Sequence, residues 1–181
     1  GGMVLYNSNP TMTDITISNN KGYDDGGGMF LNSSNPTMTT IIISNNTATS
    51  NGGGMFLYNS NPTTVINVTI TENNYTDPLG VGGGIYLDGS TITILNSILW
   101  NNTLPGINNT YLFTSTFSNI QGGIEGEGNI NVDPLFTDPE NGDYHLQEIS
   151  PCIDAGNPDS EYNDTDGSRN NMGAYGGLEG N

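Results

Sequence analysis

Hydrophobic residues alternate with polar or outward-pointing residues in short runs that return at a nearly constant interval. The first run of each unit supplies Met3 and Leu5, Met29 and Leu31, Met55 and Leu57, and Ile85 and Leu87. Since successive side chains of a strand point to opposite faces, this alternation predicts short strands with one buried face. A second alternating run in every unit supplies Ile15 and Ile17, Ile41 and Ile43, Val68 and Ile70, and Ile94 and Ile98. These residues are expected to complete the buried face.

The first two thirds of the chain form a repeat. Successive openings are separated by 26, 26 and 30 residues and begin at Gly1, Gly27, Gly53 and Gly83. A period in this range is typical of stacked repeats, in which one unit needs its neighbours to bury its apolar face. Tight corners are expected at the triple glycines 26–28, 52–54 and 82–84. The repeat predicts a parallel β-solenoid, in which each coil adds about 4.8 Å of height.

Two further positions recur with the same period. An asparagine follows the last apolar position of each coil and gives the series Asn20, Asn46, Asn73 and Asn101. Stacked coils would place these amides above one another, where they exchange hydrogen bonds. The outward side of the first strand carries Val4 and the aromatic residues Phe30, Phe56 and Tyr86. This stripe is either covered by a loop or by the C-terminal region, or it contacts another subunit or sugar rings.

Two motifs of each coil point to a known kind of repeat. The coil starts with glycines followed by a hydrophobic residue, an aromatic residue and leucine, and it ends with Ile-x-x-Asn. They resemble the right-handed parallel β-helix repeats of bacterial surface proteins, including polymorphic outer-membrane-protein-like repeats, over residues 1 to about 122. Residues 110–123 keep the alternation at Phe113, Ser115 and Phe117 and are expected to form a degenerate fifth coil. The resemblance implies an all-β chain with a right-handed parallel β-helix of about five coils over residues 1–123, at the cell surface or outside the cell.

The composition changes from Ile124 onward, where the period ends and Asp, Glu, Gly and Pro become frequent. The segments Ser-Pro-Cys-Ile-Asp-Ala-Gly at 150–156, Asp-Gly-Ser-Arg at 166–169 and Gly-Ala-Tyr at 173–175 resemble the C-terminal cap of secreted bacterial β-helices of the choice-of-anchor kind. A cap covers the backbone N–H and C=O groups of an open solenoid end, which otherwise pair with another chain. Residues 124–181 are therefore expected to form an irregular capping region.

The charge of the chain limits its partners. Nineteen acidic and two basic residues give a formal net charge of −17 at pH 7. This excludes nucleic acid as a partner, because phosphate recognition needs lysine and arginine. The apolar runs are far shorter than the roughly 20 residues of a membrane span. The acidity is expected either to keep the protein soluble or to require divalent cations or a saline surrounding, which would neutralise or screen the carboxylates.

Calcium is the expected cofactor, at a turn in the C-terminal region. Asp164 and Asp166 alternate with other oxygen donors before Gly167, as at the start of a calcium loop. The remaining ligands would come from Asp154, Asp159 and Glu161 if the fold brings them together. The alternative is an Asx-rich turn with solvated carboxylates.

Groups for catalysis are few, and we expect no enzyme activity. A lyase needs a base beside acidic ligands, and the basic residues Lys21 and Arg169 lie apart from carboxylates on strands. An inverting hydrolase needs carboxylates clustered on one face, whereas Asp14 and Asp88 come from different coils. His145 lacks a recognisable Ser or Cys nucleophile.

The expected function is that of a non-catalytic extracellular solenoid with a structural, adhesive or filament-forming role. The chain opens in mid-repeat, so its first coil is expected to expose strand edges to which another copy adds head to tail. Upstream coils that precede this sequence are the competing explanation. The alternative function is a carbohydrate-binding or polysaccharide-processing domain, with a surface polysaccharide as partner. End-to-end contacts would favour assembly, whereas a groove with clustered carboxylates or exposed coplanar rings would favour sugar.

Overall fold

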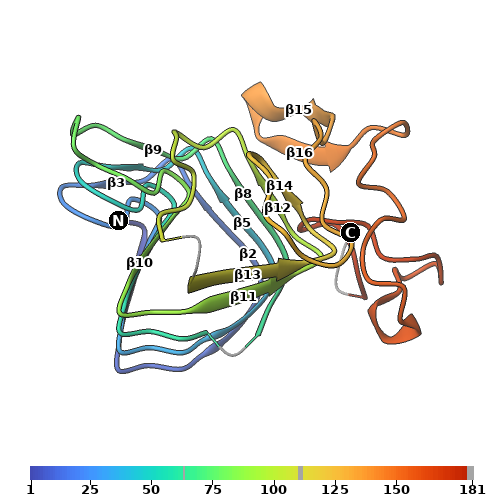
Figure 1. Cartoon of the computed structure of the whole chain (residues 1–181), viewed down its shortest axis with the longest axis horizontal. Coiled ribbons are helices and arrows are strands. Elements are labelled where there is room, and N and C mark those ends of the chain that lie inside the picture. Colours follow the sequence, from blue (N-terminus) through green and yellow to red (C-terminus); the bar gives the residue numbers. More distant parts are fainter. Residues whose placement is uncertain (63, 110–111, 179–181) are drawn as a thin grey trace.

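The computed structural model describes residues 1–62, 64–109 and 112–178. In this part of the chain the backbone winds into a β-solenoid of about 4 turns (Figure 1), which confirms the all-β solenoid. The first two residues of the predicted fifth coil and the last three of the predicted cap lie outside the described residues. Among the residues described, no helix has the length and hydropathy needed to cross a membrane.

Parallel strands from successive coils build the sides of the solenoid. Sheet A joins β1 (Met3–Tyr6), β4 (Met29–Asn32), β7 (Met55–Tyr58) and β10 (Ile85–Asp88). Sheet C joins the short strands β3 (Lys21–Gly22), β6 (Thr47–Ala48) and β9 (Asn74–Tyr75). Sheet B begins with the long strands β2 (Thr11–Ser18), β5 (Thr37–Ser44) and β8 (Thr64–Thr71). Coils 1, 2 and 3 each comprise three consecutive strands of this set, and coil 4 begins at β10.

Sheet B bends at a residue with left-handed backbone in every coil. These corner residues include Asp14 (φ 55°), Thr40 (φ 51°), Asn67 (φ 53°) and Asn96 (φ 52°). In coil 4 the corner divides the strand into β11 (Ile92–Leu95) and β12 (Ile98–Trp100). In the segment that follows coil 4, the corresponding strands are β13 (Phe113–Thr116) and β14 (Asn119–Ile120). The predicted fifth coil thus continues sheet B. The residues just before it pair with β10 of sheet A, through a bridge between Ile107 and Ile85 and a hydrogen bond from the Asn108 N–H to Ile85 O (3.2 Å).

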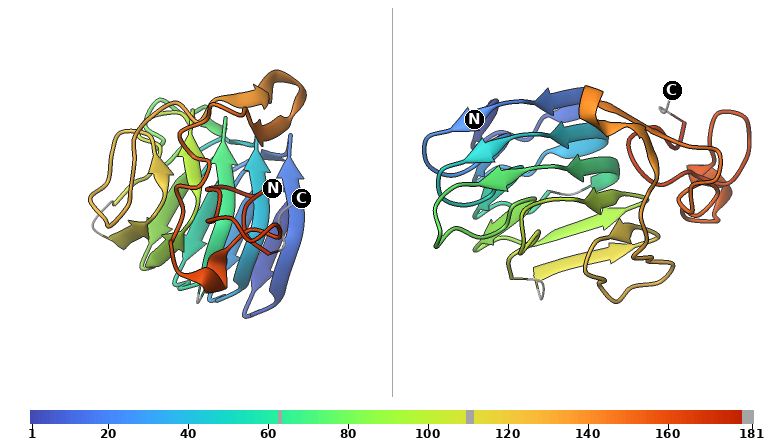
Figure 2. Two further views of the ribbon diagram at one scale, coloured as in Figure 1. Left: turned by 90° about the vertical axis from the view of Figure 1, so that its right-hand side faces the viewer. Right: turned by 90° about the horizontal axis from the view of Figure 1, so that it is seen from above.

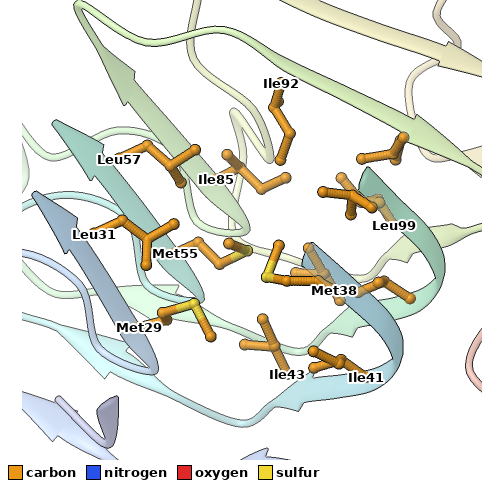
Figure 3. Packing of buried hydrophobic residues seen from close by; sticks show 14 of the residues in the cluster. Met29, Leu31, Met38, Ile41, Ile43, Met55, Leu57, Ile85, Ile92 and Leu99 are labelled. Carbon is orange, nitrogen blue, oxygen red and sulfur yellow. The ribbon is translucent and has the colours of Figure 1, made fainter. Parts of the chain in front are cut away.

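The core is a set of apolar columns that run along the solenoid axis. Met29, Met55 and Ile85 pair in register on sheet A and are fully buried. On sheet B, Ile43 pairs with Ile17 and Ile70. Figure 3 shows Met29, Met55 and Ile85 pointing inward toward Ile43 on the opposite sheet. Each coil thus covers the apolar edge of the next.

The prediction for the core of coil 4 is wrong at one position. Ile70 pairs with Leu99, so Leu99 continues the inward column. Ile98 points to the other face, where it packs with Cys152 and Met172. Since neighbouring residues of a strand face opposite ways, a shift of one residue exchanges inside and outside.

The asparagine ladder runs through the buried corner after sheet B. The Nδ2 of Asn20 donates to Oδ1 of Asn46, Asn46 Nδ2 to Asn73 Oδ1, and Asn73 Nδ2 to Asn102 Oδ1, each over 3.0 Å. The fourth member is therefore Asn102 and not Asn101, because Leu99 pairs with Ile70 and Asn102 follows three residues later. Asn101 is an exposed turn residue with a φ of 53°, a conformation that asparagine tolerates.

The C-terminal region covers both the end and the side of the solenoid, and the sequence predicted only the cover of the end. Residues 124–132 lie across the last coil, where the Ile120 N–H donates to Ile130 O (3.0 Å) and the Ile130 N–H to Ser118 O (2.9 Å). This segment closes the C-terminal end of the solenoid. Residues 133–178 instead pass along the outer face of sheet B, as the orange and red segments in Figure 2 show. We call residues 133–178 the lateral cover.

The lateral cover contains β15 (Phe136–Asp138), the 3-10 helix η2 (Pro139–Asn141), β16 (Asp143–Leu146) and the 3-10 helix η3 (Ser160–Tyr162). Tyr144 and Ala174 pack on Ile42 of coil 2, while Cys152 and Met172 pack on Ile98 of coil 4. The outer face of sheet B carries apolar side chains that need burial, which explains why most of this region covers the side and not the end.

The hydrogen bonds of Tyr144 make the cover sensitive to alkali. Its Oη donates to Glu72 Oε2 (2.9 Å) and accepts from Asn45 Nδ2 (2.8 Å). Burial, with the nearby Glu72 carboxylate, raises the pKa of Tyr144 to about 12. An unfolded tyrosine releases its proton near pH 10, so this residue's contribution to stability is lost as the pH rises from about 10 to 12.

We therefore expect Tyr144→Phe to flatten the fall in melting temperature between pH 10 and pH 12. Thermal unfolding of both proteins across this range measures it. The pKa of Cys152, raised by burial to about 11, affects both proteins equally. Parallel curves for the two proteins would contradict the role of Tyr144.

Candidate functional site: a groove along sheet A

A groove of about 520 Å³ runs along the outer face of sheet A. Because the first and third residues of the first strand of each coil point inward, the residue between them points to this outer face. The floor is formed by Val4, Tyr6, Phe30, Phe56 and Tyr58, which come from three successive coils. The other lining residues are Gly1, Asn32 and the carboxylates Asp24, Asp25 and Asp88.

The aromatic side chains of the predicted stripe, Phe30, Phe56 and Tyr86, stack on one another. The ring centroids of Phe30 and Phe56 are 5.3 Å apart at an interplanar angle of 9°, and those of Phe56 and Tyr86 are 4.9 Å apart at 8°. This spacing follows the distance between paired strands. Each inner ring covers the face of its neighbour, and Phe56 is only 6% exposed. The stripe thus presents ring edges to the groove, and accessible ring surface comes from Tyr6 and Tyr58, exposed by 59% and 40%.

Asp24 and Asp25 enter the groove from the turn between β3 and β4. The Oδ1 atom of Asp25 accepts hydrogen bonds from the backbone N–H of Asn51 (3.0 Å) and from its Nδ2 (3.1 Å). Gly26, with a φ of 66°, follows in the left-handed conformation that the turn needs. Burial raises the pKa of Asp25 above its ordinary value, and the charges of Asp24 and Asp88 act in the same direction against the hydrogen bonds from Asn51.

Carboxylates from the turn before β4 and from the end of β10 line the same groove. Asp88 ends β10 and pairs in register with Tyr58, so it occupies the place that a tyrosine has one coil earlier. The pKa of Tyr86 is raised by burial and then by Asp88 and Asp25, which places its phenol under the influence of both carboxylates. The result is an apolar floor with a negatively charged wall.

The match to a known family covers the coils. Residues 1–120 match the family described as the right handed beta helix region. The chain belongs to the right-handed β-helix family. No curated protein and no solved structure matches the chain.

The β-helix does not gather the predicted calcium ligands. The Asp164 carboxylate accepts hydrogen bonds from the backbone N–H groups of Asn171 and Gly177, and Asp166 accepts from the Ser168 N–H (2.9 Å). The Asp154 N–H donates to Asn171 Oδ1 (2.8 Å), whereas the Asp159 N–H donates to Asn157 Oδ1 (2.9 Å) in a separate turn. In the described part of the chain, no three acidic, histidine or cysteine side chains lie together as a metal site. Calcium binding stays a prediction.

Other reactive groups of the β-helix have structural surroundings. His145 Nδ1 lies 2.6 Å from Asp143 Oδ1, and the ring stacks on Tyr175 at a centroid distance of 3.7 Å, which ties β16 to the end of the lateral cover. Cys152 is fully buried, and its raised pKa keeps it a thiol at neutral pH. The Arg169 Nε donates to Gly156 O (2.6 Å) within the cover.

Proposed function

We propose that this β-helix is a non-catalytic, extracellular surface module that binds carbohydrate in the groove along sheet A. The observation that carries the proposal is the groove itself, which follows the solenoid axis and draws its lining from successive coils. Because strands in register repeat the same chemistry from coil to coil, the groove suits a linear polymer more than a compact ligand.

The groove offers the two kinds of contact that sugars use. The exposed rings of Tyr6 and Tyr58 supply apolar surface for sugar C–H groups together with hydroxyls at their tips. Asp24 and Asp88 are exposed acceptors for sugar hydroxyls. Asp25 is held by Asn51, which supports a positioning role and not a catalytic one.

Tyr58→Ala is expected to weaken binding of a linear polysaccharide about tenfold, since it removes one exposed aromatic contact. Affinity electrophoresis against a panel of immobilised neutral, cationic and anionic glycans measures the loss. Tyr23→Ala is the matched control, because Tyr23 is 89% exposed and lies outside the groove lining.

Three outcomes contradict the proposal. If no glycan in the panel binds, the groove is not a carbohydrate site. If Tyr23→Ala weakens binding as much as Tyr58→Ala, the contact lies elsewhere. Release of new reducing ends during incubation would show catalysis and contradict the non-catalytic part.

Self-association remains a second proposed role, with less support. Residues 124–132 cover β14, so in the described residues the C-terminal end has no edge that matches β1, β2 and β3 together. Head-to-tail growth would have to displace this segment. Light scattering at high protein concentration tests the role, and a monomer throughout would contradict it.

A further inference from the structure

The groove has negative charge that no basic side chain offsets. Asp24, Asp25 and Asp88 line it, whereas Lys21 lies on β3 and Arg169 in the lateral cover, both outside the lining. The whole chain carries a formal charge of −17 at pH 7. A ligand that approaches the groove therefore meets a predominantly negative field.

This field separates glycans by their charge. A polymer of uronic acids would bring carboxylates beside those of Asp25 and Asp88, and this arrangement is repulsive. A neutral glycan avoids the repulsion but gains no charged contact. A glycan with free amino groups carries ammonium ions, which form strong charge-assisted hydrogen bonds with carboxylates.

Two carboxylates of the lining, Asp25 and Asp88, can accept hydrogen bonds from such an ion. The Oδ1 atom of Asp25 accepts both hydrogen bonds from Asn51, so Asn51 leaves the Oδ2 atom of Asp25 unoccupied. Asp88 is exposed at the end of β10, next to the exposed Tyr58 on the neighbouring coil. An ammonium group beside Asp25 and Asp88 would have its sugar ring over the aromatic floor, where apolar contact adds to the charge interaction.

We propose that the groove selects a linear glycan with free amino groups, of the glucosamine-polymer class, through Asp25 and Asp88. This inference rests on the proposed carbohydrate-binding function and adds the substrate class. The groove requires a positively charged ligand, whereas uronic acid polymers are negatively charged, so it discriminates against them.

Isothermal titration with four probes at one ionic strength tests the inference. The probes are a glucosamine hexamer, an N-acetylglucosamine hexamer, a galacturonate hexamer and spermidine. We expect the glucosamine hexamer to bind about tenfold more tightly than the N-acetylated one. We expect no measurable heat from the galacturonate hexamer.

The double variant Asp25→Asn/Asp88→Asn is expected to bind both hexosamine hexamers with equal affinity. The matched control is Glu125→Gln/Glu148→Gln, which removes the same charge from exposed positions outside the groove and should keep the preference. Thermal unfolding of both variants shows that each is folded. Preference retained in the aspartate variant overturns the inference.

The remaining outcomes separate the two proposals. Equal binding of the two hexosamine hexamers by the unaltered protein overturns the amino-sugar inference but leaves carbohydrate binding intact. If no sugar binds, both fail. If spermidine binds as tightly as the glucosamine hexamer, and its binding is lost in the same aspartate variant, the inference is overturned. Positive charge alone would then account for the preference.

Discussion

Ile43→Asp is expected to destabilise the β-helix by about 4 kcal/mol or more, because it buries an unpaired carboxylate. Ile43 is fully buried and lies between Ile17 and Ile70 in the apolar column of sheet B. Urea denaturation measures the change. Thr13→Asp adds the same charge at an exposed position of β2 and should have little effect.

The damage from Ile43→Asp should have a limited range. Each coil contacts its neighbours, so fraying is expected in coils 1 to 3 and in the part of the lateral cover that packs on Ile42. The end formed by β13, β14 and residues 124–132 should keep its protection. Hydrogen exchange that shows uniform loss along the whole chain would contradict a local effect.

Asn73→Leu is expected to cost about 3–6 kcal/mol, since it leaves several buried polar groups without partners at about 1–3 kcal/mol each. The Oδ1 of Asn73 accepts from the N–H and Nδ2 of Asn46, and its Nδ2 donates to Ile43 O and to Asn102 Oδ1. The side chain is 1% exposed, so water cannot replace these bonds without opening the coil.

The same substitution at the first rung provides the comparison. Asn20 is half-buried and donates to Ser18 O and Asn46 Oδ1. Water can reach these groups, so Asn20→Leu should cost about 1 kcal/mol. Equal losses of stability for the two variants in urea denaturation would show that the ladder contributes little beyond local packing.

The repeat made the coils predictable from the sequence. Alternation identified Met29, Met55 and Ile85 as one inward column, and strand pairing places them in register. The errors came where the repeat changes length. The ladder steps by 26, 27 and 29 residues, whereas counting three residues on from Ile98, and not from Leu99, misplaced its last member by one residue.

The groove was harder to predict, because its charged residues depart from the repeat. The turn that supplies Asp24 and Asp25 has serine and asparagine at the corresponding place in coil 3, and Asp88 stands where Tyr58 stands. The sequence argument discounted Asp88 because the other strand carboxylate that it considered, Asp14, comes from a different coil. Parallel stacking brings residues of different coils together, so such departures from a repeat are the signal to search for.

The lateral cover was not predictable from periodicity, since residues 133–178 have none. Its position depends on which outward residues of sheet B are apolar. The sequence analysis assigned Ile98 to the core, so it did not identify Ile98 as the outward residue on which Cys152 and Met172 pack.

The lateral cover also limits how many coils can lie between its first and last contacts with sheet B. It packs on Ile42 of coil 2, bonds to Thr69 of coil 3 through the Ala174 N–H (3.0 Å), and packs on Ile98 of coil 4. A duplicated unit inserted between coils 2 and 4 would move these anchor points apart by one strand spacing, about 4.8 Å. A unit added before coil 2 leaves them unchanged. We therefore expect the fold to accept an additional repeat before coil 2 and to lose the contacts of the lateral cover when a repeat is inserted between coils 2 and 4.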